Sequence, residues 1–371
     1  MMSARFLTVV LERAFNMRDG FGREIDYMRI SVIDSCNLNC YYCNPCDNNE
    51  HCHALNIISV KEVLCIVRAA TRLGIKHFRL TGGEPLLHPQ LDEMVLQIKK
   101  IPGVSSVSLT TNAVLLVQHA KWLKEAGIDS INVSLDTIDA SEYERITKKP
   151  LLEEVKHGIN AAIECGIRVK INVVLTPQTD VVALTRYVAK KGTDIRFIEM
   201  MPVGEGHTNG VEPYKKVIGT LSKLYGEPCR INTEKTKEIN SGNDKRKIPD
   251  NGPAEYYIFP ELGIRVGLIQ AIHGKFCDTC NRIRVTADGR LMPCLGSSVT
   301  MDLVPDSWDF ADDVEKDFAI VRALRAAIKA KPRCHNFNDN AVTYTKTTET
   351  KTTEIEAAEV NAARNMSRIG G

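Results

Sequence analysis

The sequence predicts an α/β fold in which six parallel strands, connected by helices, form a partial barrel that is followed by a C-terminal α+β region. From residue 28 to residue 200, short β-branched runs alternate with amphipathic runs that end at glycine. This order is typical of parallel strands joined by right-handed helical crossovers. Beyond residue 250 the alternation stops, and two strand-like runs precede a hairpin turned by Asp288 and Gly289.

The expected elements follow one another in a regular order. The barrel strands are expected at residues 28–33, 77–80, 104–110, 130–135, 169–175 and 194–198. The helices between them are expected at residues 60–73, 115–126, 152–165 and 181–191, each stopped by a glycine. Ser59 and Glu62 form a capping box before the first of these helices. Two C-terminal strands are expected at residues 256–259 and 264–268.

Length, charge and cysteine content narrow the class of protein. A chain of 371 residues with 43% hydrophobic content can bury a barrel-sized core and a smaller second region. The net charge of +2 argues against a nucleic-acid-binding surface. The apolar run at residues 6–11 is too short for a signal peptide or a membrane span. Twelve cysteines without a secretory signal indicate a reducing compartment, so we expect a cytoplasmic protein.

A polar loop after the first predicted strand contains three cysteines. Cys36, Cys40 and Cys43 follow one another at intervals of four and three residues. An electron-transfer iron–sulfur cluster uses four thiolates, so a cluster held here would leave one iron open to a cofactor or substrate. A structural zinc site completed by His51 or His53 is the alternative, because zinc accepts mixed cysteine and histidine ligands.

A second group of three cysteines lies in the C-terminal region. Cys277 and Cys280 precede a predicted strand, and the hairpin returns Cys294 towards them. A second cluster with an open iron and a zinc site completed by His273 would both account for this group. Two arginines, at positions 282 and 284, alternate along the strand and therefore share a face. Guanidinium groups beside a metal centre suit a polyphosphate or carboxylate ligand.

Polar residues also follow the second, third and fourth predicted strands, at the end where ligands bind in folds of this kind. The segments are residues 81–85, with the sequence Thr-Gly-Gly-Glu-Pro, residues 110–112 and residues 134–136. The adjacent Gly82 and Gly83 have no Cβ atoms, so the backbone there can approach a ligand closely.

Together these motifs resemble the GTP 3′,8-cyclase family of molybdenum-cofactor biosynthesis, within the radical S-adenosylmethionine (SAM) superfamily. The matching segments are residues 22–32, 36–43, 80–87, 134–136, 170–174, 196–204, 252–257, 277–295 and 366–371. The second cysteine group and the terminal Gly-Gly distinguish this family from other radical SAM enzymes. The resemblance implies a partial (β/α)6 TIM-type barrel of the radical SAM type, with a C-terminal α+β region that holds a second iron–sulfur cluster.

The resemblance also implies an activity and its residues. The enzyme would be a lyase that converts GTP to (8S)-3′,8-cyclo-7,8-dihydroguanosine 5′-triphosphate, by abstraction of the 3′ hydrogen and attack on C8. Its cofactors would be SAM and two [4Fe–4S] clusters, held by Cys36, Cys40 and Cys43 and by Cys277, Cys280 and Cys294. SAM would contact Tyr42, Gly83, Ser134 and Met201. GTP would contact Arg29, Arg79, Thr110, Lys170, Arg282 and Arg284. Gly370 and Gly371 would reach the cavity near Arg196.

The partners implied are a reducing electron donor and a cyclic pyranopterin monophosphate synthase that receives the product. No nucleic-acid or membrane partner is expected, and a homodimer is compatible with the resemblance. The expected divisions are an N-terminal extension (1–21), the barrel (22–225), a polar connection (226–252), the auxiliary-cluster domain (253–335) and a flexible tail (336–371). The competing hypotheses are a radical SAM enzyme that modifies a peptide and has an auxiliary cluster, and a zinc-stabilised binding protein without catalysis.

The chain departs from the residues commonest in the family at a few positions. They are Ser35 (Arg), Asn44 (Met), His77 (Lys), His88 (Arg) and Ala113 (Gly), with the commoner residue in parentheses. None of them removes a cysteine of either group. His77 would weaken phosphate binding, and the extra Cys46 and Cys52 could hold an adventitious metal.

Overall fold

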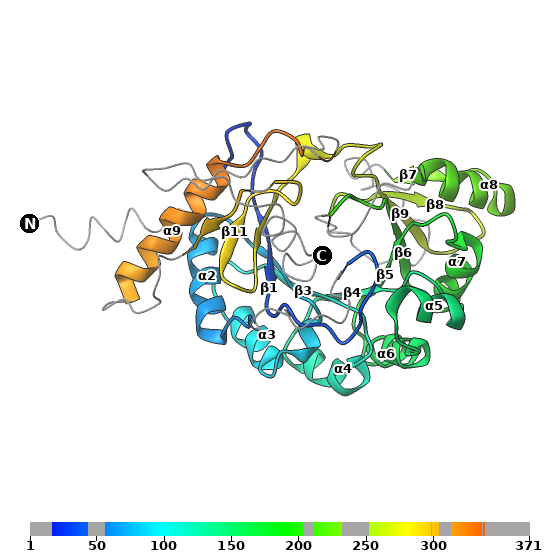
Figure 1. Cartoon of the computed structure of the whole chain (residues 1–371), viewed down its shortest axis with the longest axis horizontal. Helices are drawn as coiled ribbons and strands as arrows, with labels where there is room; N and C mark the ends of the chain where they lie inside the picture. The colour runs from blue at the N-terminus through cyan, green and yellow to red at the C-terminus, as the bar shows by residue number, and fades with distance from the viewer. Residues whose placement is uncertain are drawn as a thin grey trace, which may run out of the picture.

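The computed structural model is an open barrel whose helices cover the outer face of a curved sheet (Figure 1). The structure describes residues 17–43, 56–203, 211–231, 252–297, 299–303, 313–335 and 337. Within these residues, no helix is long and apolar enough to cross a membrane.

One sheet of twelve strands organises the described chain, in the order β12–β11–β10–β1–β2–β3–β4–β5–β6–β9–β8–β7. Six neighbouring parallel strands form the barrel wall: β1 (Tyr27–Ser31), β2 (His77–Thr81), β3 (Ser106–Thr111), β4 (Ser130–Ser134), β5 (Val169–Val174) and β6 (Asp194–Ile198). The predicted partial barrel is therefore confirmed. The sheet order is open, so the wall does not close on itself through described strands.

The predicted helices are present between the strands. They are α2 (Val60–Arg72), α4 (Leu116–Glu125), α6 (Leu152–Glu164) and α7 (Val181–Lys190). The capping box of Ser59 and Glu62 is formed at the start of α2. The sequence did not predict the other helical elements. They are the helices α3 (Leu91–Lys99), α5 (Ala140–Thr147), α8 (Gly219–Tyr225) and α9 (Asp313–Lys329), the π-helical turn η2 (Tyr214–Ile218) and the 3-10 turns η1 (Pro85–Leu87) and η3 (Cys277–Thr279).

The C-terminal region extends the barrel sheet at both edges. Strand β10 (Arg282–Val285) pairs in parallel with β1, and β9 (Arg265–Ile269) pairs in parallel with β6. The outer strands are β11 (Arg290–Met292) and β12 (Met301–Asp302) beyond β10, and β8 (Glu255–Ile258) and β7 (Cys229–Ile231) beyond β9. Residues distant in sequence thus become wall segments next to the first and sixth barrel strands.

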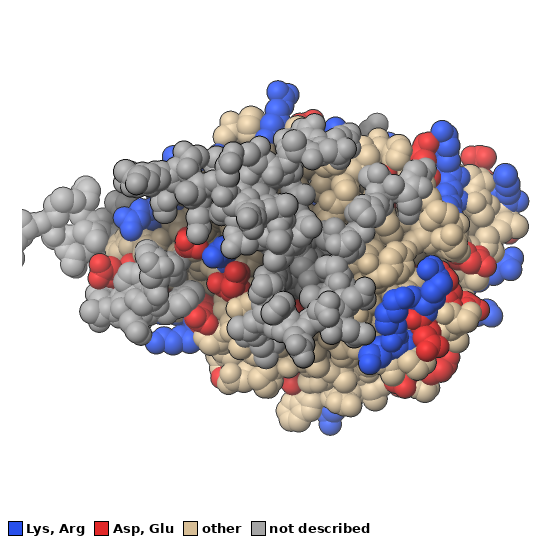
Figure 2. All heavy atoms as spheres, in the orientation of Figure 1, with Lys and Arg blue, Asp and Glu red and all other residues tan. Residues whose placement is uncertain are grey.

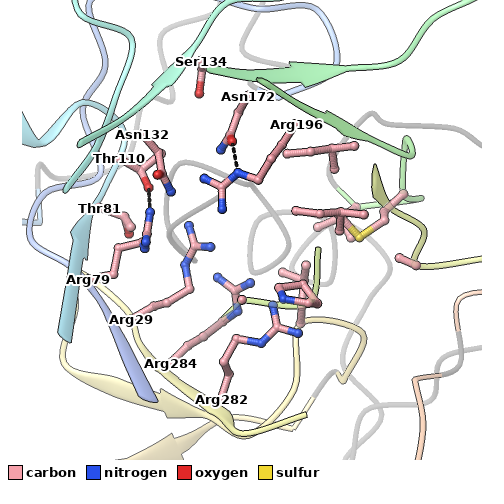
Figure 3. Close-up of a pocket in the computed structure, with 18 of the residues that line it drawn as sticks. Arg29, Arg79, Thr81, Thr110, Asn132, Ser134, Asn172, Arg196, Arg282 and Arg284 are labelled. Carbon is pink, nitrogen blue, oxygen red and sulfur yellow. Dashed lines mark hydrogen bonds between the residues drawn. The ribbon is translucent and has the colours of Figure 1, made fainter. Parts of the chain in front are cut away.

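The inner and outer faces of the barrel wall differ in polarity. Residues that face the helices, such as Met28, Phe78 and Val133, are fully buried and apolar. Their neighbours in the strands point the other way, because side chains alternate along a strand. These inward residues are polar, as Arg79, Thr110 and Asn132 illustrate in Figure 3. The barrel interior therefore has the composition of a binding site rather than of a hydrophobic core.

The outer surface carries both signs of charge. On the face that Figure 2 shows, basic and acidic side chains are interspersed around the rim. Described surface residues form local ion pairs, such as Arg145 with Glu142 and Lys156 with Glu153. This mixture agrees with the net charge of +2.

Candidate active-site cavity

A cavity of ≈ 810 Å³ occupies the interior of the barrel. Its lining comes from all six barrel strands, from β10 and from both cysteine groups. All predicted site residues that the structure describes line this cavity. Gly370 and Gly371 lie outside the described residues, so the predicted role of the tail stays a prediction.

The first cysteine group lies at the carboxyl end of β1. Two backbone hydrogen bonds fix its loop to α5: Asn39 N–H donates to the Thr147 carbonyl at 3.0 Å, and Tyr41 N–H donates to the Ile146 carbonyl at 3.1 Å. The Leu38 N–H points at the Cys36 sulfur from 3.4 Å. Helix α5, which was not predicted, thus supplies the support on which the cysteine loop is built.

Burial is the main influence on the pKa values of the Cys36 and Cys40 thiols. Burial raises the pKa of Cys36 to about 11, and it raises that of Cys40 well above its usual value, with Cys43 and Asp136 adding to the effect. Tyr42 donates a 2.5 Å hydrogen bond to Asp136, whose own pKa burial raises to about 6. A thiolate here needs a cationic partner, and the iron of a cluster provides one.

The tip of β2 packs directly on the cysteine loop. A Cβ atom at Gly82 would collide with the Ile33 carbonyl oxygen, and one at Gly83 would collide with the Ser35 carbonyl oxygen. The predicted need for glycine is explained first by this contact between two backbone segments. Gly83 also lines the cavity, where the predicted SAM contact would lie.

A buried carboxylate connects the tips of β2 and β3. Glu84 accepts hydrogen bonds from the Thr111 hydroxyl and the Asn112 N–H, both at 2.7 Å. Asn112 in turn donates to Asn37 at 2.7 Å and lies 3.8 Å from the Cys36 sulfur. Burial raises the pKa of Glu84 to about 7. This chain of contacts orients the first cysteine of the loop, and the sequence pattern did not show it.

The second cysteine group lies at the opposite end of the barrel. Cys277 and Cys280 directly precede β10, and β10 runs parallel to β1, so they lie near the amino end of β1. Cys294 follows β11, which runs antiparallel to β10 and returns to the same end. The length of β1, roughly 13 Å from Tyr27 to Ser31 at about 3.3 Å per residue, lies between the two groups. The cavity therefore connects two separate thiol sites.

The second group has cationic neighbours. Burial raises the pKa of Cys277. Burial also acts to raise the pKa of Cys280, but the Arg282 guanidinium and the Lys331 ammonium outweigh it and lower the value to about 7. Lys331 was not predicted as a site residue, because no motif or spacing in the sequence marks it.

Of the histidines in the two zinc hypotheses, the structure describes only His273. The His273 ring pairs with Glu199, and His273 does not line the cavity. His51 and His53 lie outside the described residues. Among the residues that the structure does describe, no three Cys, His, Asp or Glu side chains form a site for a single metal ion.

Three neighbouring strands present arginines side by side. Arg29 is paired in register with Arg79 on β2 and with Arg284 on β10, and Figure 3 shows these side chains converging on one space with Arg282. Burial, together with the charge of Arg284, lowers the pKa of Arg29 well below its usual value. Burial and Arg282 lower the pKa of Arg284 to about 10. Guanidiniums this close stabilise a ligand with several negative charges.

The facing wall adds two further cations. Lys170 lies on β5, and Arg196 on β6 donates to Asn172 at 3.0 Å. Arg79 reaches the Thr110 hydroxyl at 3.4 Å and also hydrogen-bonds Tyr27. The polar groups thus surround the middle of the cavity from several strands.

His77, one of the departures from the family pattern, lines the amino end of the cavity. Its Nδ1 lies 2.8 Å from the Ser106 hydroxyl, and burial lowers its pKa. A neutral imidazole attracts phosphate less than a lysine does, so the expected weakening of phosphate binding stays a prediction.

Comparison with known proteins agrees with this geometry. Residues 30–183 match the family model described as the Radical SAM superfamily, and residues 193–337 match the model described as Molybdenum Cofactor Synthesis C. A GTP 3′,8-cyclase of Clostridium perfringens is 35% identical over 324 residues, which cover 86% of this chain and 95% of that protein. The chain belongs to the GTP 3′,8-cyclase family. Membership of the radical SAM superfamily implies SAM and a [4Fe–4S] cluster.

Other comparisons agree with the family and the fold. The GTP 3′,8-cyclase of Pelotomaculum thermopropionicum is 36% identical over 327 residues, covering 86% of this chain and 95% of that protein. The solved structure of Streptococcus suis SuiB bound to S-adenosylmethionine superposes with a TM-score of 0.54 at 15% identity. That superposition covers 81% of this chain and 65% of SuiB, and at this identity it shows the fold alone.

Proposed function

We propose that the protein is a lyase that binds GTP in the barrel cavity and converts it to (8S)-3′,8-cyclo-7,8-dihydroguanosine 5′-triphosphate for molybdenum-cofactor biosynthesis. The observation that supports this most directly is the set of buried arginines on β1, β2 and β10, which lies between two thiol groups. A triphosphate satisfies several guanidiniums at once through charge-assisted hydrogen bonds. A peptide offers no comparable density of negative charge.

The cofactor residues fit the chemistry of open iron–sulfur clusters. Each thiol group has three cysteines on the cavity wall, and a cluster bound by three thiolates keeps one iron for another ligand. Cys36, Cys40 and Cys43 would hold the cluster that binds SAM, beside Tyr42, Gly83, Ser134 and Met201. Cys277, Cys280 and Cys294 would hold a second [4Fe–4S] cluster. When bound, SAM and the first cluster supply a deoxyadenosyl radical.

The position of the two thiol groups suggests how GTP is oriented. The guanine base would face the second group at the amino end of β1, and the ribose would face the SAM end. Arg29, Arg79 and Arg284 would then hold the triphosphate along the wall between them. Thr110 and Lys170 would contact the ribose and its phosphates from neighbouring strands.

The main contribution of the protein itself to the reaction would be to hold the bound GTP in position. C3′ of the ribose must lie close to the radical and to C8 of guanine in the same bound geometry, and such preorganisation accelerates reactions strongly. A cavity lined by the barrel strands also limits the access of water to reactive intermediates. Gly370 and Gly371 would complete the enclosure near Arg196. An external reductant, product transfer to a cyclic pyranopterin monophosphate synthase, and a homodimer belong to the same proposal.

An anaerobic assay tests this function. The protein is reconstituted with iron and sulfide, supplied with SAM and dithionite, and incubated with GTP, with ATP or without nucleotide. We expect deoxyadenosine and a cyclised guanine nucleotide to form together only with GTP. Equal deoxyadenosine formation in all three reactions, without a new nucleotide, would indicate a radical SAM enzyme with a different substrate.

A further inference from the structure

Lys331 follows helix α9 and lies beside the second cysteine group. It is 3% exposed and lines the cavity. Its ammonium donates to the Arg282 carbonyl and to the Pro293 carbonyl, both at 2.8 Å. These two carbonyls belong to the segments that lead away from Cys280 and into Cys294. The ammonium therefore lies between two of the three cysteines.

Two of the three donors of this ammonium bind backbone carbonyls in the segments that carry the cysteines. Arg282 lies two residues after Cys280, and Pro293 directly precedes Cys294. These two contacts fix the charge of Lys331 beside the cysteine group.

A buried ammonium is costly unless negative charge compensates it. Removing such an ion from water costs several kcal/mol after relaxation, and two neutral carbonyls return only part of that cost. No carboxylate forms an ion pair with Lys331 among the described residues. Cys280 and Cys294, which line the cavity together with Lys331, would supply negative charge as thiolates and through the cluster that they bind.

The backbone around Lys331 holds it in place. Arg23 donates to the carbonyls of Pro332 and Arg333 at 2.6 and 2.9 Å, and to the Cys277 carbonyl at 2.7 Å. Arg23 is itself fixed by a buried ion pair with Asp19. The segment after α9 and the Cys277 loop are thus connected through one side chain, so Lys331 has little freedom to move away from Cys280.

We propose that Lys331 raises the reduction potential of the auxiliary [4Fe–4S] cluster by fixing a buried positive charge beside Cys280. This inference rests on the proposed function, because it needs the second cluster. Net charge and hydrogen bonds at the sulfurs are established determinants of cluster potential. Reduction adds a negative charge, which the ammonium stabilises. Removing the ammonium therefore makes the cluster harder to reduce, and electron transfer through it becomes less favourable.

The test is a potentiometric titration of the reconstituted full-length protein, followed by electron paramagnetic resonance. Cys294→Ala identifies the signal of the auxiliary cluster, because this variant lacks one of its ligands. Lys331→Met and Lys331→Gln remove the charge, and Gln keeps a hydrogen-bond donor. Lys331→Arg keeps the charge. Lys329→Met is the matched control, since Lys329 is exposed at the end of the same helix.

We expect both neutral variants to lower the reduced-to-oxidised ratio of the auxiliary cluster at least about tenfold at a fixed solution potential. For a one-electron couple this equals a shift of about 59 mV. The signal of the first cluster should not move, and Lys331→Arg and Lys329→Met should match the unmodified protein.

Three results would contradict the inference, and they have different meanings. An auxiliary signal at the original potential in Lys331→Gln would show that the charge does not tune the cluster. Loss of about four irons in both neutral variants would show that Lys331 only supports the fold of the cysteine group. An unmodified protein that binds no second cluster would instead overturn the proposed function on which the inference depends.

Discussion

The two cysteine groups lie at opposite ends of one barrel and have opposite electrostatic surroundings. Carboxylates lie near the first group: Glu84 and Asp136 raise the pKa of Cys36 and Cys40, in addition to burial. Cations lie near the second group, where Arg282 and Lys331 lower the pKa of Cys280. SAM has a sulfonium and an ammonium group, whereas GTP is a polyanion. The carboxylates thus lie where we assign SAM, and the cations of the second group lie next to the arginines to which we assign the triphosphate of GTP.

The backbone differs between the two groups as well. Two non-glycine residues have positive φ angles within the described chain, Ala113 at 65° and Lys148 at 61°. Both lie beside the first group: Ala113 follows Asn112, and Lys148 caps helix α5, which binds the cysteine loop. Such angles are strained for residues with a Cβ atom. The backbone that supports the first cysteine group is therefore locally strained. Among the described residues around the second group, no non-glycine residue has a positive φ angle.

The largest expected effect comes from removing one cysteine of each group. Cys40→Ala should abolish deoxyadenosine formation, because the first cluster would lose a ligand. Cys294→Ala should leave SAM cleavage intact and abolish the cyclised product. Product analysis by mass spectrometry, with iron quantified in both variants, distinguishes the two groups. Undiminished conversion of GTP by Cys294→Ala would refute the role assigned to the second group.

The next effect concerns the buried arginines that line the cavity near the second cysteine group. Arg284→Gln removes charge-assisted hydrogen bonds worth about 1.5–3 kcal/mol, so the dissociation constant for GTP should rise roughly 10- to 150-fold. The affinity for SAM should not change. Equilibrium binding of both ligands measures this. Arg290→Gln in the same hairpin is the control, because Arg290 is half exposed and pairs only with surface carboxylates. Equal losses in both variants would contradict the assignment.

A smaller effect concerns Asp136, which lies beside the first cysteine group. Burial raises its pKa from 3.8 to about 6, so its contribution to stability is complete below pH 3.8 and is lost as the pH rises through about 6. A shift of about two units corresponds to about 3 kcal/mol. Asp136→Asn should therefore remove a fall of up to this size in the free energy of unfolding of the iron-free protein between pH 4 and pH 7. Denaturant titrations at several pH values measure it.

The control for this prediction is Asp302→Asn, in which an exposed carboxylate on β12 is replaced. The pH dependence of that variant should match the unmodified protein. If Asp136→Asn kept the same slope, the carboxylate of Asp136 would not be destabilised by burial, and the electrostatic contrast between the two ends would lose its support.

The smallest effect concerns the strained backbone. Ala113→Gly removes the Cβ atom at φ 65°, and it should stabilise the protein by about 1 kcal/mol while SAM cleavage stays unchanged. Thermal unfolding and deoxyadenosine formation are measured together. A destabilised variant would mean that the freedom which glycine adds to the unfolded chain exceeds the strain that is relieved.

The barrel and most of its cavity could be predicted because local patterns determine them. Alternation along the strand predicted that Arg282 and Arg284 share a face, and glycines after the helices marked the ends of the repeats, whereas Arg79 and Thr110 were expected at the site from the family resemblance. The capping box at Ser59 likewise depends on residues three positions apart. The roles of the individual cavity residues remain predictions.

The rest depends on contacts between distant segments. The pairing of β10 with β1 joins residues about 255 positions apart, and this pairing puts the second cysteine group at the amino end of the barrel. Nothing near Cys277 in the sequence indicates that end. The hydrogen bond from Tyr42 to Asp136 and the burial of Lys331 are likewise consequences of the assembled fold. Single residues without a repeated spacing, such as Lys331, give no sequence signal at all.

Transfer of deuterium from GTP to deoxyadenosine is the most direct test of the central claim that GTP lies between the two thiol groups with C3′ towards the SAM end. The reconstituted protein is incubated with SAM, dithionite and GTP labelled with deuterium at C3′, and GTP labelled at C2′ is the control. Our account predicts one deuterium in the deoxyadenosine from the 3′-labelled substrate and none from the control. Unlabelled deoxyadenosine from both substrates would contradict it.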